Sequence, residues 1–500
     1  MMLLLVLLGL GVLLELGLHT PGYLWRWRKV LAAVALLVTS FASGALLVWQ
    51  FNLWSLLILL ASLYRIFNCL RIVDGRMHEH YMNHATLRTS LVLISLQMLA
   101  GGLWLVWDSW QETGHLAWAL IGSAQLAMAL VLFSSTVRRM RRTAWPQKSP
   151  AASDSELPTL TVAIPARNET EDLQACLETL VASNYPKLEI LVLDDCSQTR
   201  RTPEIIRSFA HAGVRFLEGR EAELSWQPKN QAYSHLLGEA SGEYVLFCGV
   251  DVRFSPNALR QLMTTMLQKK KVMLSLLPWR ATVAERRFAV VQAMRYLWEL
   301  APPRRMFNRP PVLSTCWVAK KADLQNAGGF EAVKRSILPE AHFARALTKN
   351  DAYSFMRASR RLGIESTKPA KEQHETAMRM RYPQLRKRPE SVFLLGQAYG
   401  FFLLMPFVMS IAGFWISIGT AAHVFAAAAA VLLSFTYLQV AAATRTGSLW
   451  FGLVLLPAGL LYDLVLLHIS MRRYEFSVVE WKGRNVCIPV MHVSRRLPQI

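Results

Sequence analysis

The feature that most constrains this sequence is the distribution of its apolar residues, which gather in two blocks toward the ends of the chain. They concentrate before residue 136 and after residue 391, and a stretch of ordinary polarity separates the two blocks. Only 18% of the 500 residues are charged, whereas an average soluble domain is about 25% charged. The pattern predicts membrane-embedded helices on both sides of one water-exposed domain.

The apolar runs have the length that a membrane span requires, which is about 20 residues. The runs lie at about 2–18, 30–49, 51–68, 90–107, 116–135, 392–419, 422–441 and 449–470. The run at 2–18 lacks the basic start and the cleavage site of a signal peptide and is interrupted by Glu15, so we interpret it as a retained helix. We expect about five helices in an N-terminal transmembrane region, 1–142, and a C-terminal transmembrane region at 391–472.

The basic residues between the runs predict an orientation. Lys and Arg follow the first run, surround the connection between the third and the fourth, and cluster at 138–142, whereas the loop 108–115 carries acids and neither Lys nor Arg. Under the positive-inside rule, the segment after the fifth helix is cytoplasmic. We therefore expect a multi-pass protein of the cell (inner) membrane whose catalytic domain is cytoplasmic.

The net charge of +21 also bears on partners. Because the basic clusters adjoin apolar runs, they favour contact with membrane lipids, and we expect no nucleic-acid partner. Residues 473–500 form a basic juxtamembrane tail. Three C-terminal crossings would place this tail outside, against its charge, so we expect the run at 392–419 to be split or to lie partly in the interface.

The middle of the chain has the pattern of an α/β domain. A linker rich in Ala, Ser and Pro at 143–158 precedes a domain at 159–390. Continuous apolar runs alternate there with amphipathic segments, which predicts a mostly parallel sheet covered by helices on both faces. The predicted strands lie at 159–165, 188–193, 214–217 and 243–248, and the predicted helices at 170–182, 203–212 and 229–240.

Polar residues follow three of these strands. Arg167 and Glu169 follow the first strand, Asp194 and Asp195 end the second, and Asp251 follows the fourth. Ligands of open parallel sheets bind beyond the carboxyl ends of the strands. A single acid there is often only a helix cap, but two acidic strand ends could hold a nucleoside and a metal-bound diphosphate, since Mg²⁺ commonly takes one or two carboxylates plus substrate phosphates.

The order of these motifs resembles that of a known family. PARNE at 165–169, LDDCS at 193–197 and EYVLFCGVDV at 243–252 resemble the first half of a family 2 glycosyltransferase with the GT-A fold. WQPKN at 226–230 resembles the W-x-x-K-N element of membrane relatives that glycosylate carotenoids, hopanoids or ceramide, and WKGR at 481–484 recurs near the end of such enzymes. The resemblance implies a Rossmann-like GT-A catalytic domain in an inverting, hexosyltransferase-like enzyme. Its donor would be a nucleotide-sugar, by default a UDP-sugar, and its acceptor a lipid or polyprenoid.

The resemblance also implies roles for residues at the nucleotide end of the site. Asp195, with Asp194 beside it, would contact the base and the ribose. Arg167 and Glu169 would line the same pocket. Lys229, in the WQPKN element, would face the diphosphate, whose developing negative charge needs a cation.

Four further positions concern the metal, the base and the donor or acceptor sugar. Asp251 matches the last carboxylate of the family's D-x-D and would hold Mg²⁺ or Mn²⁺. Alignment on the following Ala-Arg places Glu340 at the position of the base that takes the proton of the acceptor hydroxyl. Arg381 and Tyr382 are what survives of the Q-x-x-R-W signature. They would close the donor site or stack on the acceptor sugar. An equally weighted alternative is that this basic stretch contacts anionic lipid headgroups.

The departures from the family pattern leave alternatives open. Gly249 replaces the first carboxylate of the D-x-D, and Glu340 stands where the family has Asp. A processive polysaccharide synthase would need a complete Q-x-x-R-W. A catalytically inactive membrane scaffold of the same fold would explain the missing carboxylate. The sequence leaves the sugar, the nucleotide and the acceptor open.

Overall fold

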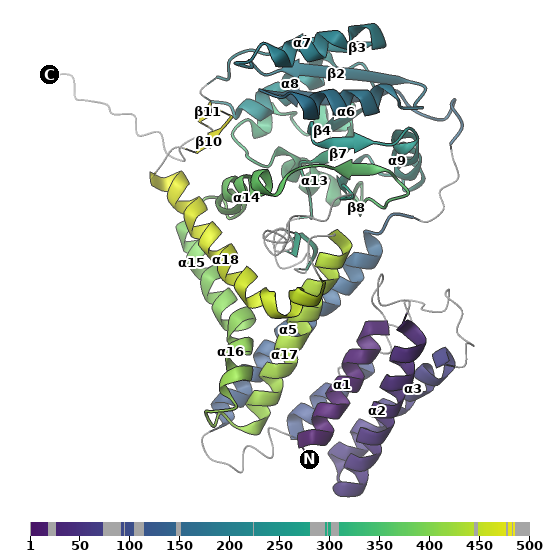
Figure 1. Ribbon diagram of the computed structural model, residues 1–500, viewed down its shortest axis with the longest axis vertical. Coiled ribbons are helices and arrows are strands. Elements are labelled where there is room, and N and C mark those ends of the chain that lie inside the picture. The colour runs from purple at the N-terminus through teal and green to yellow at the C-terminus, as the bar shows by residue number, and fades with distance from the viewer. Residues whose placement is uncertain are drawn as a thin grey trace, which may run out of the picture. The chain divides into compact units, whose positions relative to one another are not determined.

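The structure of the chain is a computed structural model (Figure 1). It divides into two compact units, the first made of Met1–Arg141, Leu395–Ala443 and Ser448–Leu461, and the second of Arg142–Leu394, Thr444–Gly447 and Tyr462–Ile500. The residues that the structure describes are 2–18, 27–73, 92–94, 96–104, 115–146, 152–223, 225–280, 296–297, 299–301, 310–444, 449–476, 479–482 and 484–485.

The first unit is helical, and five described helices are long and apolar enough to cross a membrane. These are Arg28–Trp49, Leu53–Val73, Leu116–Arg142, Pro389–Ala412 and Thr420–Ala442. By length and composition they indicate a membrane protein. Among the described residues, the helices of this unit include α1 (Met2–Leu18), α2 (Arg28–Trp49), α3 (Leu53–Val73), α5 (Leu116–Arg142), α16 (Met405–Ala412), α17 (Thr420–Thr444) and the first half of α18 (Leu449–Phe476).

The first C-terminal apolar stretch, which we expected to be split or to lie partly in the interface, contains one candidate span, Pro389–Ala412. The helix α15 (Pro389–Ala398) continues through a π-helical segment, Tyr399–Leu404, into α16. Pro406 lies in the first turn of α16 and has no N–H to donate to the preceding turn. A widened π turn before a proline accommodates this missing bond without ending the helix.

Charged side chains inside the first unit are paired. Arg65 of α3 donates through Nε to Glu15 Oε2 of α1 at 2.6 Å, and it also bonds to Gln97. Arg65 is fully buried and Glu15 nearly so. Because an isolated charge in an apolar environment is costly, this pairing is what allows Glu15 to lie within an apolar helix.

The second unit contains a seven-stranded sheet in the order β3-β2-β1-β4-β7-β6-β8 (Figure 1). β1 pairs in parallel with β2 and β4, and β2 with β3, so the prediction of a mostly parallel sheet is confirmed. β7 is antiparallel to both of its neighbours. The strands are β1 (Leu160–Ala166), β2 (Leu188–Asp194), β3 (Val214–Glu218), β4 (Tyr244–Cys248), β6 (Met273–Leu277), β7 (Cys316–Lys320) and β8 (Tyr353–Arg357).

Helices connect and cover these strands. Two of them, α8 and α13, begin with a proline, whose fixed φ and missing N–H suit the first turn of a helix. Lys229 and Glu340 each follow that proline, so both side chains start from the first turn of a helix. The main helices are α6 (Glu171–Val181), α7 (Arg201–Ser208), α8 (Pro228–Glu239), α9 (Ala258–Gln268), α12 (Lys321–Asn326), α13 (Pro339–Thr348) and α14 (Ala370–Gln384).

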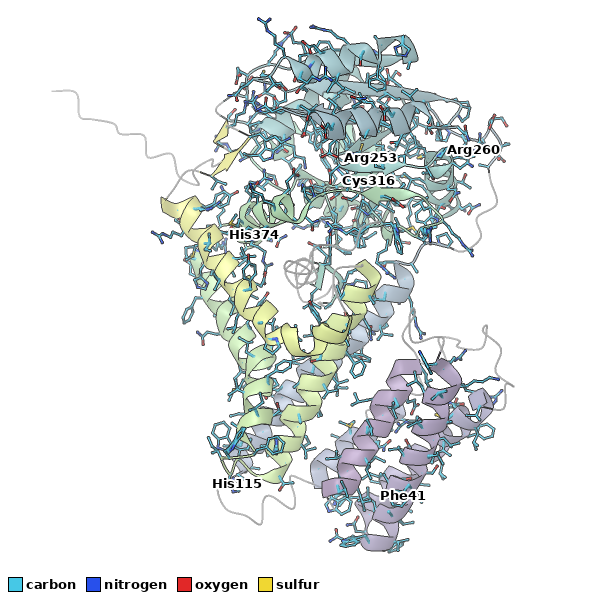
Figure 2. All side chains as sticks on the ribbon, viewed as in Figure 1. Phe41, His115, Arg253, Arg260, Cys316 and His374 are labelled. Carbon is cyan, nitrogen blue, oxygen red and sulfur yellow. The ribbon has the colours of Figure 1, made fainter. Side chains whose placement is uncertain are left out.

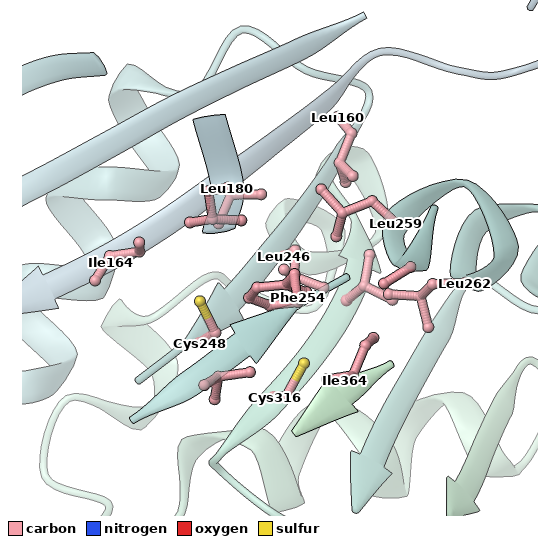
Figure 3. Packing of buried hydrophobic residues seen from close by; sticks show 14 of the residues in the cluster. Leu160, Ile164, Leu180, Leu246, Cys248, Phe254, Leu259, Leu262, Cys316 and Ile364 are labelled. Carbon is pink, nitrogen blue, oxygen red and sulfur yellow. The ribbon is translucent and has the colours of Figure 1, made fainter. Parts of the chain in front are cut away.

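The two faces of the sheet have different cores, because side chains alternate along a strand. On one face, Leu246 and Cys248 of β4 and Cys316 of β7 join a large aliphatic cluster with residues of α6 and α9 (Figure 3). On the other face, Phe247 stacks on Trp317 with ring centroids 4.4 Å apart. Tyr233, Phe330 and Phe343 complete this aromatic cluster.

Two small sheets lie outside the main one. β5 (Val252–Phe254) pairs with β9 (Ile364–Ser366), and Arg253 of β5 forms an ion pair of 2.6 Å with Asp172 of α6 (Figure 2). β10 (Glu480–Trp481) and β11 (Arg484–Asn485) form a hairpin. This hairpin and the second half of α18, which the sequence analysis assigned to the membrane region and the basic tail, belong to the same compact unit as the sheet.

Candidate active site

The ends of β1 and β2 form one rim of the candidate site. Ala166 and Asp194 are register partners, and the N–H of Asp195 donates to the carbonyl of Ala166 at 2.8 Å. Arg167, which is 4% exposed, donates through one terminal nitrogen to the carbonyls of Asp195 at 2.6 Å and Cys196 at 2.5 Å. Cys196 has a φ of +51°, a region that a non-glycine residue adopts at a cost. Arg167 therefore holds the turn after β2 in place.

The acids of this rim have partners within the chain. Asp194 accepts the N–H of Ser197 at 3.3 Å, which is a local turn contact. Asp195 pairs with Arg484 at 2.8 Å, and Glu169 pairs with Lys482. Burial raises the pKa of Asp195, while Arg484 and Arg167 act in the opposite direction. Burial also raises the pKa of Glu169, and the charge of Lys482 opposes this rise without cancelling it.

A second group of charges gathers around Lys229. Burial lowers the pKa of Lys229, and the charges of Glu340 and Asp251 raise it again. Lys368 and Arg379 lower it further. The four charged side chains of Glu340, Asp251, Lys368 and Arg379 therefore all lie close enough to Lys229 to change its pKa. The structure brings together two predicted acids and the predicted diphosphate lysine, and it adds two cations that the sequence analysis did not single out.

Glu340 and Lys229 both lie against the aromatic core. Glu340 is fully buried in the first turn of α13, and Lys229 Nζ lies 5.0 Å from the ring centroid of Tyr233. The charges of Glu340 and Asp251 also reach Tyr233, whose pKa is raised by burial first and then by these two acids. The aromatic cluster thus forms an apolar wall beside the charged group, where electrostatic interactions are stronger than in water.

Asp251 is positioned by hydrogen bonds to the end of β9. Its Oδ2 accepts the hydroxyl of Ser366 at 3.2 Å, and its carbonyl accepts the N–H of Thr367 at 2.9 Å. A Cβ added at Gly249 would lie 2.4 Å from Asp251 Oδ1. The glycine that replaces the first carboxylate of the D-x-D therefore leaves the space into which the Asp251 side chain folds back.

The donor set limits what metal this site fits. Within the described part of the chain, no group of three or more His, Cys, Asp or Glu side chains could hold a metal ion. A single carboxylate, Asp251, does not make a closed protein site. It does fit a Mg²⁺ or Mn²⁺ ion that takes most of its remaining oxygen ligands from water and from a substrate diphosphate.

Arg381 and Tyr382 are engaged elsewhere. Arg381 pairs with Asp463 of α18, and Tyr382, which is fully buried, donates its hydroxyl to Glu475. Its backbone N–H also donates to Ser470 at 3.1 Å. Both side chains thus connect α14 to α18, and a fully buried ring has no surface for stacking on a sugar. Their expected contact with donor or acceptor stays a prediction, and Arg379 is the arginine of this helix that shares the Lys229 cluster.

Several of these residues gave no local signal in the sequence. Lys368 and Arg379 lie in a stretch of mixed charge in which no spacing distinguishes them. Lys482 and Arg484 belong to WKGR, which the resemblance marked as recurrent but did not connect to the strand ends. The one hint in the sequence was the motif itself. Because WKGR recurs near the end of enzymes that the chain resembles, its basic residues, Lys482 and Arg484, could have been proposed as part of the site.

A family comparison agrees with this geometry. The family described as Glycosyl transferase family 2 matches residues 161–324. The uncharacterized glycosyltransferase YibD of Escherichia coli (strain K12) is 32% identical over 111 residues, which cover 22% of this chain and 30% of that protein. Glycosyltransferase AglE of Haloferax volcanii is 35% identical over 101 residues, covering 19% of this chain and 32% of that protein. The chain thus spans about a third of the length of either relative.

Solved structures with detectable likeness are more distant. The mannosyltransferase PcManGT from Pyrobaculum calidifontis, in complex with GDP-Man and Mn²⁺, is 19% identical, with a TM-score of 0.41, over 71% of this chain and 97% of that one. S. aureus TarS is 16% identical, with a TM-score of 0.32, over 44% of this chain and 38% of that one. The strands β1 to β4, the acids that follow them and the family match all fall in the same part of the chain. Residues 161–324 are therefore a family 2 glycosyltransferase domain with the GT-A fold.

Proposed function

We propose that this protein is a membrane glycosyltransferase that transfers a sugar from a nucleotide-sugar to a lipid or polyprenoid acceptor. The observation that carries the proposal is that the charges of Glu340 and Asp251 both act on the pKa of Lys229, whose ammonium lies 5.0 Å from the ring centroid of Tyr233 in the aromatic cluster. Sugar transfer needs a carboxylate that takes a proton and cations that stabilise the leaving diphosphate. The cluster supplies both kinds of group.

The donor would extend from the strand rim to this cluster. Asp195 and Asp194 would contact the nucleoside, in a pocket lined by Arg167 and Glu169. The diphosphate would face Lys229, joined by Lys368 and Arg379. Mg²⁺ or Mn²⁺ bound by Asp251 and the donor phosphates would neutralise part of the negative charge on the leaving group. We infer UDP as the nucleotide because the family resemblance favours it.

The reaction would proceed with inversion. Glu340 would accept the proton of the acceptor hydroxyl while that oxygen attacks the anomeric carbon from the side opposite the diphosphate. A bond forms between the acceptor oxygen and the carbon, and the bond from that carbon to the phosphate oxygen breaks. Lys229 would stabilise the departing diphosphate. Glu is one methylene longer than the Asp of the family pattern, and the proline that starts α13 fixes the backbone from which this longer side chain reaches.

A hydrophobic acceptor follows from the chain's organisation. Apolar helices precede and follow the glycosyltransferase domain in the sequence. An enzyme that acts on a soluble sugar acceptor would not need apolar helices on both sides of its catalytic domain. The distribution of basic residues supports a multi-pass protein of the inner membrane with the catalytic domain in the cytoplasm, where nucleotide-sugars and the inner leaflet meet.

Product analysis tests this proposal against its alternatives. The full-length protein in nanodiscs of total lipid extract is incubated with UDP- and GDP-sugars and Mn²⁺, and the lipids are analysed by mass spectrometry. A lipid heavier by one sugar residue is the expected product. A ladder of repeated sugars would identify a processive polysaccharide synthase instead. Absence of product and of donor hydrolysis would support the inactive scaffold, which the loss of a carboxylate at Gly249 favours.

The pH dependence of donor binding follows from the surroundings of Lys229. Because burial lowers the pKa of Lys229, this side chain loses its charge at a lower pH than an ordinary lysine. Affinity for UDP is therefore expected to fall on the alkaline side while ordinary lysines are still charged, as measured by isothermal titration calorimetry. Lys229→Arg should move this loss to higher pH, since arginine stays charged throughout.

Protein unfolding does not explain this alkaline loss. Between the lowered pKa of Lys229 in the folded protein and its ordinary pKa in the unfolded chain, the unfolded state binds more protons. The contribution of Lys229 to the free energy of unfolding therefore increases with pH in this window. An affinity that stays flat with pH in the wild type would argue against contact between Lys229 and the diphosphate.

Gly249→Ala is expected to weaken Mn²⁺-dependent UDP binding by about 10- to 100-fold, in the range seen when partners that orient a metal ligand are lost. The added methyl group would lie 2.4 Å from Asp251 Oδ1, so the carboxylate must turn away and its bond to Ser366 is disturbed. The matched control is Gly238→Ala in α8, where an added Cβ meets nothing within 4 Å. Equal Mn²⁺ dependence in Gly249→Ala and the wild type would remove Asp251 from the metal site.

A further inference from the structure

The hairpin β10–β11 joins the strand rim to the cluster around Lys229. Trp481 and Arg484 pair across it, and Lys482, which follows Trp481, has a φ of +47°. A non-glycine residue adopts this left-handed backbone only where its surroundings hold it. Figure 1 shows the hairpin following α18, beside the α/β part of its own compact unit. The contacts of its side chains explain why this turn is held.

The turn is fastened to the end of β1 in both directions. Lys482 Nζ donates to the carbonyl of Arg167 at 3.0 Å and pairs with the carboxylate of Glu169. In return, Arg167 Nε donates to the carbonyl of Lys482 at 3.1 Å. The same arginine holds the turn after β2 through its other nitrogen. Arg167 is thus the centre of a junction between β1, β2 and the hairpin.

Arg484, on the second strand of the hairpin, contacts the end of β2. Arg484 donates to Asp195 Oδ1 at 2.8 Å and to Glu221 Oε2 at 3.2 Å. The side chains of Arg484 and Asp195 are only 10% and 7% exposed. Burial raises the pKa of Asp195, and Arg484 opposes this rise while its hydrogen bond fixes the orientation of the carboxylate. An oriented acid is what hydrogen-bond recognition of a nucleoside needs.

Trp481 extends the hairpin toward the other half of the site. The guanidinium carbon of Arg379 lies 5.6 Å from the centroid of the Trp481 ring, within the range of a cation–π contact. The backbone of Arg379 is held as well, because its carbonyl accepts the hydroxyl of Tyr474 at 2.9 Å. The charge of Arg379 acts on Lys229, so the indole ring supports a cation of the diphosphate cluster.

We propose that the β10–β11 hairpin is a positioning clamp of the nucleotide-sugar site, in which Arg484 and Lys482 hold Asp195 and Glu169 for the nucleoside and Trp481 holds Arg379 for the diphosphate. The clamp rests on the proposed transferase function, because it needs a nucleoside diphosphate as ligand. An inhibitory plug would have to withdraw before the donor binds. Two observations indicate instead that the hairpin is a permanent part of the site. Arg167 and Lys482 each donate to the other's backbone carbonyl, and the ion pair between Arg484 and Asp195 is almost fully buried.

Direct nucleotide binding tests the clamp. The probes are UDP and GDP with Mn²⁺, titrated into the detergent-solubilised full-length protein and followed by calorimetry. Arg484→Ala is expected to weaken UDP or GDP binding by about 10- to 100-fold, the loss typical of a charge-assisted hydrogen bond that orients a ligand group. Arg484→Lys should recover part of the affinity, because it keeps the charge and loses the planar fork.

The matched control is Arg215→Ala. Arg215 also contacts two carboxylates, Glu189 at 2.5 Å and Glu239 at 3.4 Å, but its side chain is 47% exposed and it lies near the beginning of β3. Its nucleotide affinity should equal that of the wild type. In turnover assays, Arg484→Ala should raise KM for the donor more than it lowers kcat, whereas a loss of folded protein would lower the apparent kcat alone.

The outcomes separate the clamp from the transferase proposal. Unchanged or tighter nucleotide binding by folded Arg484→Ala overturns the clamp and leaves the transferase standing. No nucleotide binding by the wild type overturns both. If Arg484→Ala does not fold, Lys482→Met decides, since it removes the contact with Glu169 and leaves the Arg484–Asp195 pair in place. Binding by folded Lys482→Met that matches the wild type would then overturn the clamp.

Discussion

Glu340→Gln is expected to lower kcat by about 10²- to 10⁴-fold, the range that a positioned general base contributes. Glutamine keeps the size of the side chain and cannot accept the proton of the acceptor hydroxyl. Because the two side chains have nearly the same size and shape, the replacement should leave the packing around the fully buried Glu340 almost unchanged. The measurement is the rate of single-sugar transfer at saturating donor and acceptor, with KM for the donor determined in parallel.

The matched control is Glu239→Gln at the end of α8, where the side chain is 45% exposed and pairs only with Arg215 among the ion pairs described. Its kcat should stay within about twofold of the wild type, since exposed ion pairs contribute little to the folded state. UDP binding by Glu340→Gln should be retained, but its alkaline loss should move to lower pH, because the charge of Glu340 no longer raises the pKa of Lys229. A Glu340→Gln protein with full kcat would show that Glu340 is not the base.

Arg381→Met alone is expected to lower the free energy of unfolding by about 3–5 kcal/mol, because it removes the cation that pairs with the buried carboxylate of Asp463. The two side chains are 8% and 5% exposed. The double variant Arg381→Met/Asp463→Leu should recover most of this loss, since apolar residues of similar size can replace a buried ion pair at little cost. Thermal unfolding in detergent measures the shift in Tm for each protein.

This pair of variants also decides what Arg381 does. If its role is to join α14 to α18, the double variant should fold and bind UDP as the wild type does. A stable double variant that has lost UDP binding would instead support the donor contact that the family resemblance implies. The control is Arg388→Met, whose exposed side chain lies in the same basic stretch and should change stability by less than about 0.5 kcal/mol.

Local patterns in the sequence were sufficient for much of the fold. The continuous apolar run at 159–165 predicted β1, and the acids after 193 predicted a polar strand end, because a buried parallel strand must be apolar throughout and its carboxyl end must face a ligand or solvent. The prolines before Lys229 and Glu340 start helices for reasons that are equally local. The reversed direction of β7 left no such trace, since an antiparallel strand buried on both faces has the same composition as a parallel one.

The sequence by itself determined the first four strands of the domain, the apolar helices and the acids at the strand ends, because each depends on neighbours a few residues away. Only the tertiary structure decided which cation meets which acid. Asp195 and Arg484 are separated by 289 positions, and Arg379 joins Lys229 while Arg381, two residues later, turns to α18. Such pairings follow from how strands, helices and the hairpin pack together, and a pairing between distant residues leaves no periodicity in the chain.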